Sequence, residues 1–151
     1  GHPEVGNAAE LARFFKLQEI RSWFEYKGNP IGARAILNKP VPIQYFTEAA
    51  QQISGAISPL ILPFGKREIS KVGIVTGSGA FAIDQAAQDG LELLISGEAK
   101  QSCYHHCREV GINALFLGHY ATETFGVLAL ARTLVEKFEV KTVFIDEPTG
   151  I

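Results

Sequence analysis

The segment GHYATETFG, residues 118–126, contains a histidine and a glutamate four positions apart, His119 and Glu123. The apolar run INALFL precedes this segment and VLALARTLVEKF, with helical spacing, follows it, so the pair lies where a strand passes into a helix. An imidazole nitrogen and a carboxylate oxygen are suitable ligands for zinc, manganese or iron. The same pair could form a hydrogen-bonded acid–base dyad, or be a helix-initiating charge beside a turn histidine. Spacing alone does not choose among these three interpretations.

Polar residues also follow two other apolar runs. TGSG, residues 76–79, follows KVGIV, and SGE, residues 96–98, follows LELLI. The backbone around Ser78 could meet an anion, but it lacks both the dinucleotide fingerprint and the phosphate-loop lysine. Glu98 is either a favourable charge at a helix start or a functional carboxylate. Because parallel strands point their carboxyl ends the same way, we expect these segments and GHYATE to share one ligand-binding rim.

A further group of potential ligands, Cys103, His105, His106 and Cys107, falls within QSCYHHCREVG. A structural zinc site usually takes four ligands in two separated pairs, and the sequence has no second pair. Adjacent helical residues point about 100° apart, so at most one of the two histidines can face the core or the rim. We therefore expect reduced thiols and structural histidines on a helix.

Apolar runs alternate with helical patterns from residue 71 onward. Continuous Ile, Leu, Val and Phe runs are typical of strands buried on both faces, and the helices between them require crossovers. The pattern predicts strands at 71–77, 91–97, 112–118 and 141–146, and helices at 79–90, 99–111 and 122–138. We thus predict an α/β fold with a mainly parallel sheet flanked by helices on both faces.

Capping residues, prolines and turn residues indicate the elements before residue 71. Asn7 stands at a capping position before a helical pattern. Pro40 and Pro42 indicate an edge-like strand end, because proline cannot donate to a ladder. The expected elements are a helix from residue 8, a turn at 27–30, a strand at 33–41, a helix at 43–55 closed by Gly55, and a short strand with a connection at 57–70.

The composition is that of a globular protein with a substantial core. The chain has 151 residues, 46% of them hydrophobic, and a formal net charge of -2. A near-neutral charge without basic runs argues against nucleic acid or an anionic membrane as the partner. No apolar stretch is long enough to span a bilayer, and no basic-then-apolar leader opens the sequence, so we expect a cytoplasmic location.

Three segments carry a resemblance to a known family: HPEVGNAAELA, TGSGAFAIDQAAQDGLELLISGE and GHYATETFGVLALARTLVEKF with the closing VFIDEP. They resemble the NIF-three-like family (Ngg-interacting factor three), whose bacterial members are often named GTP cyclohydrolase type 2 homologues. The likeness runs from His2 to Pro148. It implies a site for two divalent metal ions in a cleft between α/β lobes, and a ring-shaped homohexamer. By this resemblance His119 and Glu123 are metal ligands, and Glu98 is a catalytic or neighbouring carboxylate.

The resemblance also implies an incomplete ligand set. Family members add a histidine pair from a first lobe and an aspartate shortly before the HPE stretch. We therefore expect residues 1–30 to be the end of the first lobe and a linker, residues 31–151 to be the α/β lobe carrying the metal motif, and a further N-terminal lobe to be absent. The expected function is a dinuclear metal-dependent hydrolase for a nucleotide or other small molecule, similar to GTP cyclohydrolase type 2. The alternative is a non-catalytic metal-binding regulatory or protein-interaction adaptor.

Overall fold

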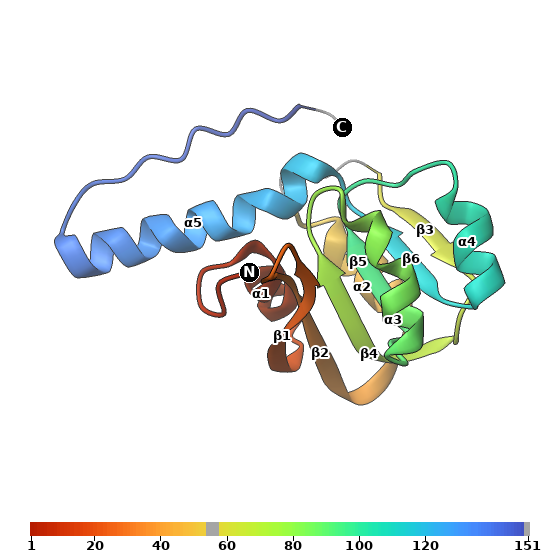
Figure 1. The fold of residues 1–151 in the computed structure, drawn as a ribbon. Coiled ribbons are helices and arrows are strands. Elements are labelled where there is room, and N and C mark those ends of the chain that lie inside the picture. The colour runs from red at the N-terminus through yellow and green to blue at the C-terminus, as the bar shows by residue number, and fades with distance from the viewer. Residues whose placement is uncertain (54–57, 150–151) are drawn as a thin grey trace.

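A six-stranded sheet in the order β1-β2-β4-β5-β6-β3 forms the centre of the molecule (Figure 1). The computed structural model describes residues 1–53 and 58–149. The strands are β1 (Gln18–Tyr26), β2 (Asn29–Pro42), β3 (Leu60–Pro63), β4 (Glu68–Val75), β5 (Leu93–Ser96) and β6 (Asn113–Phe116). The helices are α1 (Asn7–Phe14), α2 (Gln44–Ala50), the 3-10 helix η1 (Gly79–Ala82), α3 (Ile83–Gln88), α4 (Cys103–Val110) and α5 (His119–Phe138). The predicted closure of the second helix at Gly55 lies outside the described residues.

The sheet is mixed, and most of its pairings are antiparallel. β4, β5 and β6 pair in parallel, whereas β1 with β2, β2 with β4 and β3 with β6 pair antiparallel. The predicted α/β fold is confirmed, but the prediction of a mainly parallel sheet is wrong. One physical reason is the turn at Lys27 and Gly28, where φ is +52° and +78°. Two positive φ angles make a two-residue hairpin loop, which joins neighbouring strands antiparallel.

The predicted strand at 141–146 is also wrong. Residues 139–149 form an extended tail that runs back along α5 without joining the sheet (Figure 1). Glu139 ends α5 in the left-handed conformation, with φ +54°. Val143 and Ile145 are 86% and 78% exposed. The β-branched and aromatic composition of this segment is typical of a strand, but strand formation needs a pairing partner, and the described residues supply none.

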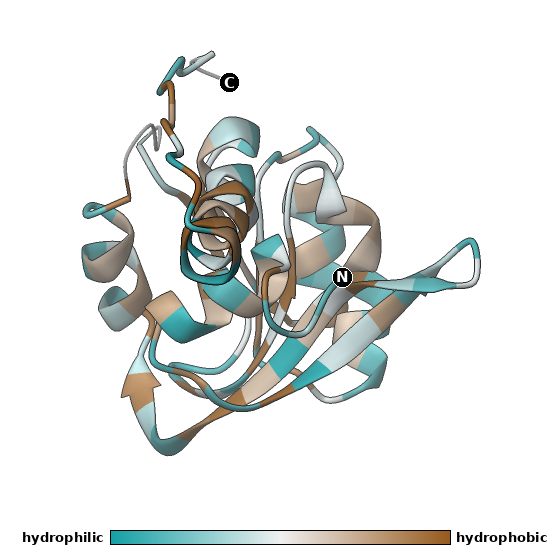
Figure 2. Cartoon of the chain, turned by 90° about the vertical axis from the view of Figure 1, so that its left-hand side faces the viewer, coloured by the Kyte–Doolittle hydropathy of each residue, from teal (hydrophilic) through white to brown (hydrophobic). Residues whose placement is uncertain are grey.

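Helices cover both faces of the sheet, and each face has its own core. One core packs α1 and α2 on the sheet and is centred on Leu11, Phe15, Phe46 and Ile74. The other packs α3 and α4 on the opposite face. α5 extends beyond the sheet, where it contacts α1 and the tail runs back along it (Figure 1), and it carries apolar residues (Figure 2). Among the described residues, no helix combines the length and the apolar character that a bilayer crossing requires.

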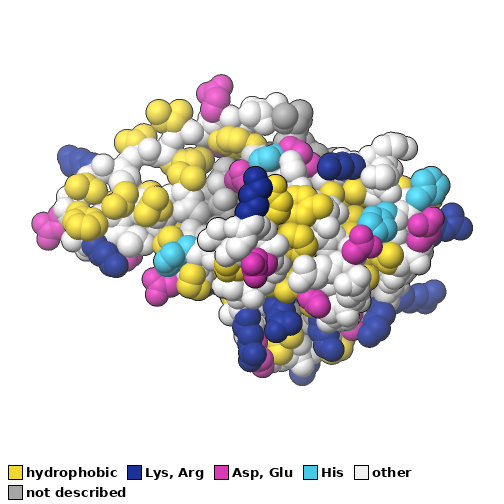
Figure 3. All heavy atoms as spheres, in the orientation of Figure 1, with side chains coloured by type: hydrophobic (Ala, Val, Ile, Leu, Met, Phe, Trp, Pro, Cys, Tyr) yellow, Lys and Arg dark blue, Asp and Glu magenta, His cyan; other side chains and the backbone are white. Residues whose placement is uncertain are grey.

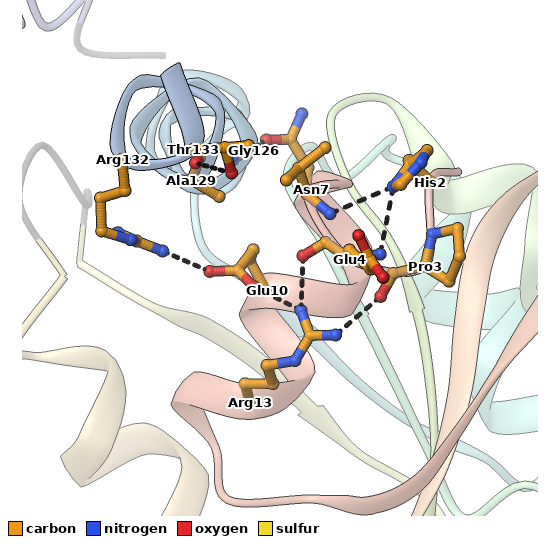
Figure 4. A network of polar contacts seen from close by, with 11 residues as sticks. His2, Pro3, Glu4, Asn7, Glu10, Arg13, Gly126, Ala129, Arg132 and Thr133 are labelled. Atoms are coloured by element: carbon orange, nitrogen blue, oxygen red, sulfur yellow. Dashed lines mark hydrogen bonds and ion pairs between the residues drawn. The ribbon is translucent and has the colours of Figure 1, made fainter. Parts of the chain in front are cut away.

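The N-terminal segment anchors α5 to the body of the molecule (Figure 4). Gly6, not the expected Asn7, occupies the N-cap of α1. The Asn7 side-chain oxygen instead accepts the N–H of Gly126 in α5 at 2.6 Å. A Cβ on Gly126 would lie only 2.6 Å from this oxygen, so the glycine permits the close approach. Arg132 of α5 adds an ion pair to Glu10 of α1 at 2.7 Å. These contacts fix the first half of α5, which carries His119 and Glu123.

Candidate metal site

The carboxyl ends of β4, β5 and β6 meet at one rim. The Gly77 carbonyl after β4 accepts the N–H groups of Gly97 and Glu98 after β5, at 2.9 and 3.0 Å. Gly118 after β6 donates its N–H to the Gly97 carbonyl at 2.9 Å. The predicted convergence of TGSG, SGE and GHYATE is therefore confirmed.

Thr122 connects the start of α5 to this rim. Its side chain is fully buried, and its hydroxyl oxygen accepts the Gly77 N–H at 3.0 Å. The same hydroxyl lies 3.1 and 3.0 Å from the carbonyl oxygens of Gly118 and His119, to which it can donate. The helix expected from residue 122 thus begins at His119. Residues four apart lie on one face of a helix, so His119 and Glu123 are neighbours there.

His119 contacts a carboxylate through each ring nitrogen. Its Nδ1 hydrogen-bonds Glu98 Oε1, and its Nε2 lies 3.2 Å from Glu123 Oε2. The other oxygen of Glu98 accepts the Ser78 hydroxyl. Because an ionised carboxylate only accepts, Nδ1 must carry a proton. The structure therefore brings together all three residues that the sequence singled out, and adds Ser78 as a partner of Glu98.

These contacts shift two pKa values in opposite directions. The hydrogen bonds from Ser78 and then His119 lower the pKa of Glu98. The hydrogen bond to Glu98, with the added attraction of Glu123, raises the pKa of His119 despite partial burial. Both changes favour a charged pair in the protein without metal. A proton and a cation would compete for the same atom, His119 Nε2.

The pair of His119 and Glu123 fits a divalent cation. Two donors about 2.1 Å from one ion, at an angle of about 100°, are about 3.2 Å apart, which is the observed distance between Nε2 and Oε2. Gly77 backs the pair with φ +62°, and a Cβ there would lie 2.7 Å from Glu123 Oε1 and 2.9 Å from His119 Nε2. Glu98 matches the outer carboxylate that commonly orients a metal-binding histidine.

The described part of the chain supplies only these two ligands at the rim. No group of three or more His, Cys, Asp and Glu side chains arranged to hold an ion occurs within residues 1–53 and 58–149. The side chains of His119 and Glu123 are 37% and 45% exposed, so further ligands could reach them. Protein zinc sites normally have three or four protein ligands.

A pocket of about 400 Å³ opens beside the pair. Tyr120 and Val127 of α5 line it together with Phe144 and Ile145 of the tail. The Tyr120 hydroxyl donates to Asp146 at 2.7 Å and so holds the tail over the site. This apolar wall was not predicted from the sequence, because the tail was expected to join the sheet.

The cysteines and the neighbouring histidines of α4 do not join the site. Cys103 and Cys107 are free, buried thiols in the core under α4. Burial raises the pKa of Cys107 to about 11, so its thiol is neutral. His106 Nε2 pairs instead with Asp84 Oδ1 of α3 at 2.6 Å.

Comparison with known proteins places the chain among a set of longer relatives. A family model described as Duf34/NIF3 (NGG1p interacting factor 3) matches residues 1–150. A protein of Deinococcus radiodurans named GTP cyclohydrolase 1 type 2 homolog is 39% identical over 150 residues, which are 99% of this chain and 57% of the relative. A protein of the same name from Archaeoglobus fulgidus is 40% identical over 150 residues, 99% of this chain and 59% of the relative. The chain thus spans less than two thirds of the length of these relatives.

Solved structures agree with the observed fold. TTHA1606 of Thermus thermophilus superposes with a TM-score of 0.87 at 34% identity, covering 100% of this chain and 58% of that one. Protein ybgI, a structural genomics target of unknown function, superposes with a TM-score of 0.85 at 30% identity, covering 99% of this chain and 59% of that one. The family match, the curated relatives and these structures agree, and the chain belongs to the Duf34/NIF3 (NGG1p interacting factor 3) family.

Proposed function

We propose that this chain supplies part of the metal site of a metal-dependent hydrolase acting on a nucleotide or another small molecule. The observation that supports the proposal most is the 3.2 Å separation of His119 Nε2 and Glu123 Oε2, with Gly77 leaving space behind them. The names of the curated relatives suggest an activity similar to GTP cyclohydrolase type 2. The apolar wall of the adjoining pocket suits an organic molecule of modest size.

A divalent ion at this position would polarise a substrate oxygen and make water a better nucleophile at neutral pH. His119 would contribute Nε2 and Glu123 one carboxylate oxygen. Glu98 has both oxygens engaged, by Ser78 and by His119 Nδ1. We therefore assign Glu98 the role of holding the proton on Nδ1 and orienting the imidazole, rather than that of a base acting on water.

Two ions per complete site, as the resemblance implies, would require ligands beyond these two residues. In the proposal these come from a further part of a longer polypeptide or from another copy of the chain. A homohexamer and a cytoplasmic location belong to the same proposal. Zinc, manganese and iron all accept imidazole or carboxylate ligands.

The second candidate function is a metal-binding regulatory or adaptor protein without catalysis. The observation that favours it is the ligand count, because the described residues offer two ligands and leave both more than one third exposed. An ion held in this way binds reversibly and is available to a partner.

Metal binding and turnover distinguish the two functions. The chain is titrated with zinc, manganese and iron(II), and is then incubated with a panel of nucleotides and esters. His119→Ala and Glu123→Ala remove the ligands. His106→Ala is the matched control, because His106 also pairs with a carboxylate but lies on α4, outside the pocket. Turnover that persists in the control and disappears in both ligand variants supports the hydrolase. Stoichiometric metal binding without turnover supports the adaptor, and metal binding unchanged in both ligand variants refutes both functions.

A further inference from the structure

A second cluster of charged side chains lies on the sheet, far from the metal site. Arg21 of β1 and Arg34 of β2 are directly opposite each other across the antiparallel pair. Arg34 is in turn opposite Gly73 of β4, and Lys71 precedes Gly73 by two residues. Because side chains alternate along a strand, Arg21, Arg34 and Lys71 project from the same face.

The positive charges in this cluster are poorly compensated. Like charges directly opposite across strands are destabilising. The Arg34 and Lys71 side chains have no hydrogen bond or ion pair with any other residue in the described part of the chain. Arg21 has only a long contact of 3.5 Å to Glu19, and both side chains are more than 60% exposed. Arg34 and Lys71 are therefore available to pair with an anion from solution.

The three cations line a common pocket of about 270 Å³. Ile36 and Leu91 give it apolar walls, and the carboxylates of Glu19 and Asp89 also lie on it. Asp89 Oδ2 is occupied by the indole N–H of Trp23 at 2.6 Å. Figure 3 shows Lys and Arg side chains gathered over the lower ends of β1, β2 and β4.

This pocket is separate from the metal site. Lys71 precedes Gly77, which backs the metal ligands, by six residues along β4 and the turn that follows it. At about 3.3 Å per residue the strand part alone, from Lys71 to Val75, spans about 13 Å. The two sites share no lining residue.

We propose that the pocket of Arg21, Arg34 and Lys71 binds the phosphoryl group of a small phosphorylated molecule. Guanidinium groups match phosphate oxygens in paired hydrogen bonds and remain charged at all physiological pH values. An anion between Arg21 and Arg34 removes their mutual repulsion. The pocket is small, at about 270 Å³, and the chain has a net charge of -2, so a small ligand fits better than nucleic acid.

Inorganic pyrophosphate is the probe, and its binding to the metal-free chain at low salt is measured by titration calorimetry. Inorganic phosphate, AMP and a single-stranded oligonucleotide are titrated in the same way for comparison. Arg34→Gln is expected to weaken pyrophosphate binding about tenfold or more, because it removes charged hydrogen bonds. Arg108→Gln on α4 makes the same charge change outside the pocket and is expected to leave the affinity within about twofold. Weaker binding at higher salt is also expected.

Thermal unfolding separates loss of the ligand site from loss of the fold. Arg34→Gln is expected to keep or raise the Tm, because it relieves the repulsion with Arg21. The proposal is overturned if pyrophosphate does not bind, if Arg34→Gln binds it as the unmodified chain does, or if the oligonucleotide binds more tightly than pyrophosphate. None of these results depends on His119 or Glu123, so the metal site is tested separately.

Discussion

Replacing Gly77 with alanine tests whether the space behind the metal ligands is required. Gly77 has φ +62°, and an added Cβ would lie 2.7 Å from Glu123 Oε1 and 2.9 Å from His119 Nε2. Cβ atoms do not approach heavy atoms this closely, so both side chains must move. Both contacts are with side-chain ends, which can yield at little expense to the fold.

The expected magnitudes follow from these contacts. A left-handed alanine costs about 1 to 2 kcal/mol of the free energy of unfolding. Displaced ligands should weaken zinc binding by about 10- to 100-fold, the range found when the supports of a metal ligand are removed. Gly77→Ala should therefore lose a modest amount of stability and a large amount of metal affinity.

Gly90→Ala is the matched control. Gly90 has φ +69° and no atom within 4 Å of an added Cβ. Its alanine variant carries the same backbone strain without touching a ligand. Urea unfolding should give similar losses for the two variants, and zinc calorimetry should show weakened binding only for Gly77→Ala. Equal zinc affinity in the two variants would refute the assignment of Gly77 as the back wall of the site.

Three further predictions concern titration and reactivity. Burial alone would raise the pKa of Glu92, but hydrogen bonds from Lys66 and the start of β4 lower it to about 2. Glu92→Gln should therefore lower the free energy of unfolding by about 2 to 3 kcal/mol at pH 7. Urea titrations should show that this difference disappears as the pH falls from about 4.5 towards 2. The raised pKa of His119 and the lowered pKa of Glu98 make their ion pair most stabilising between pH of about 4.5 and 6.5. This stabilisation is lost in acid as Glu98 is protonated, and at higher pH as His119 loses its charge. Zinc affinity, measured by calorimetry across pH, should instead increase as His119 loses the proton on Nε2, and a pH-independent zinc affinity would contradict this prediction. Cys107, with its pKa raised to about 11 by burial, should react with a thiol reagent at pH 8 only after unfolding, and labelling in the folded chain would contradict its burial.

The parallel half of the fold was predictable because its strands are continuous apolar runs. β5 and β6 are buried throughout, as are the last four residues of β4, and such apolar runs can be identified as strands without knowledge of the neighbouring strand. β1 is different, since only Trp23 among its nine residues is buried. The turn at 27–30 was predicted, but the strand before it was not, because the strand conformation of β1 depends on its pairing with β2. The strand predicted at 141–146 is wrong for the opposite reason, because its residues favour a strand but find no pairing partner among the described residues.

The candidate site was predictable where it depends on local geometry. The four-residue spacing places Glu123 beside His119 on one helical turn, and parallel strand ends bring Glu98 to the same rim. The hydrogen bonds of Glu98 to His119 Nδ1 and to the Ser78 hydroxyl depend on the conformation of the loops that follow β4 and β5. The tail over the pocket depends on the Tyr120–Asp146 contact between residues 26 positions apart. Spacing rules carry no information on such contacts.

If the proposed function is correct, His119 Nε2 and a Glu123 oxygen share one cation. Anomalous X-ray diffraction at the zinc edge, on crystals of the chain grown with zinc, locates that cation. We expect an anomalous peak about 2 Å from both atoms, with Glu98 still hydrogen-bonded to His119 Nδ1. A zinc ion bound elsewhere, with these two side chains turned apart, would contradict it.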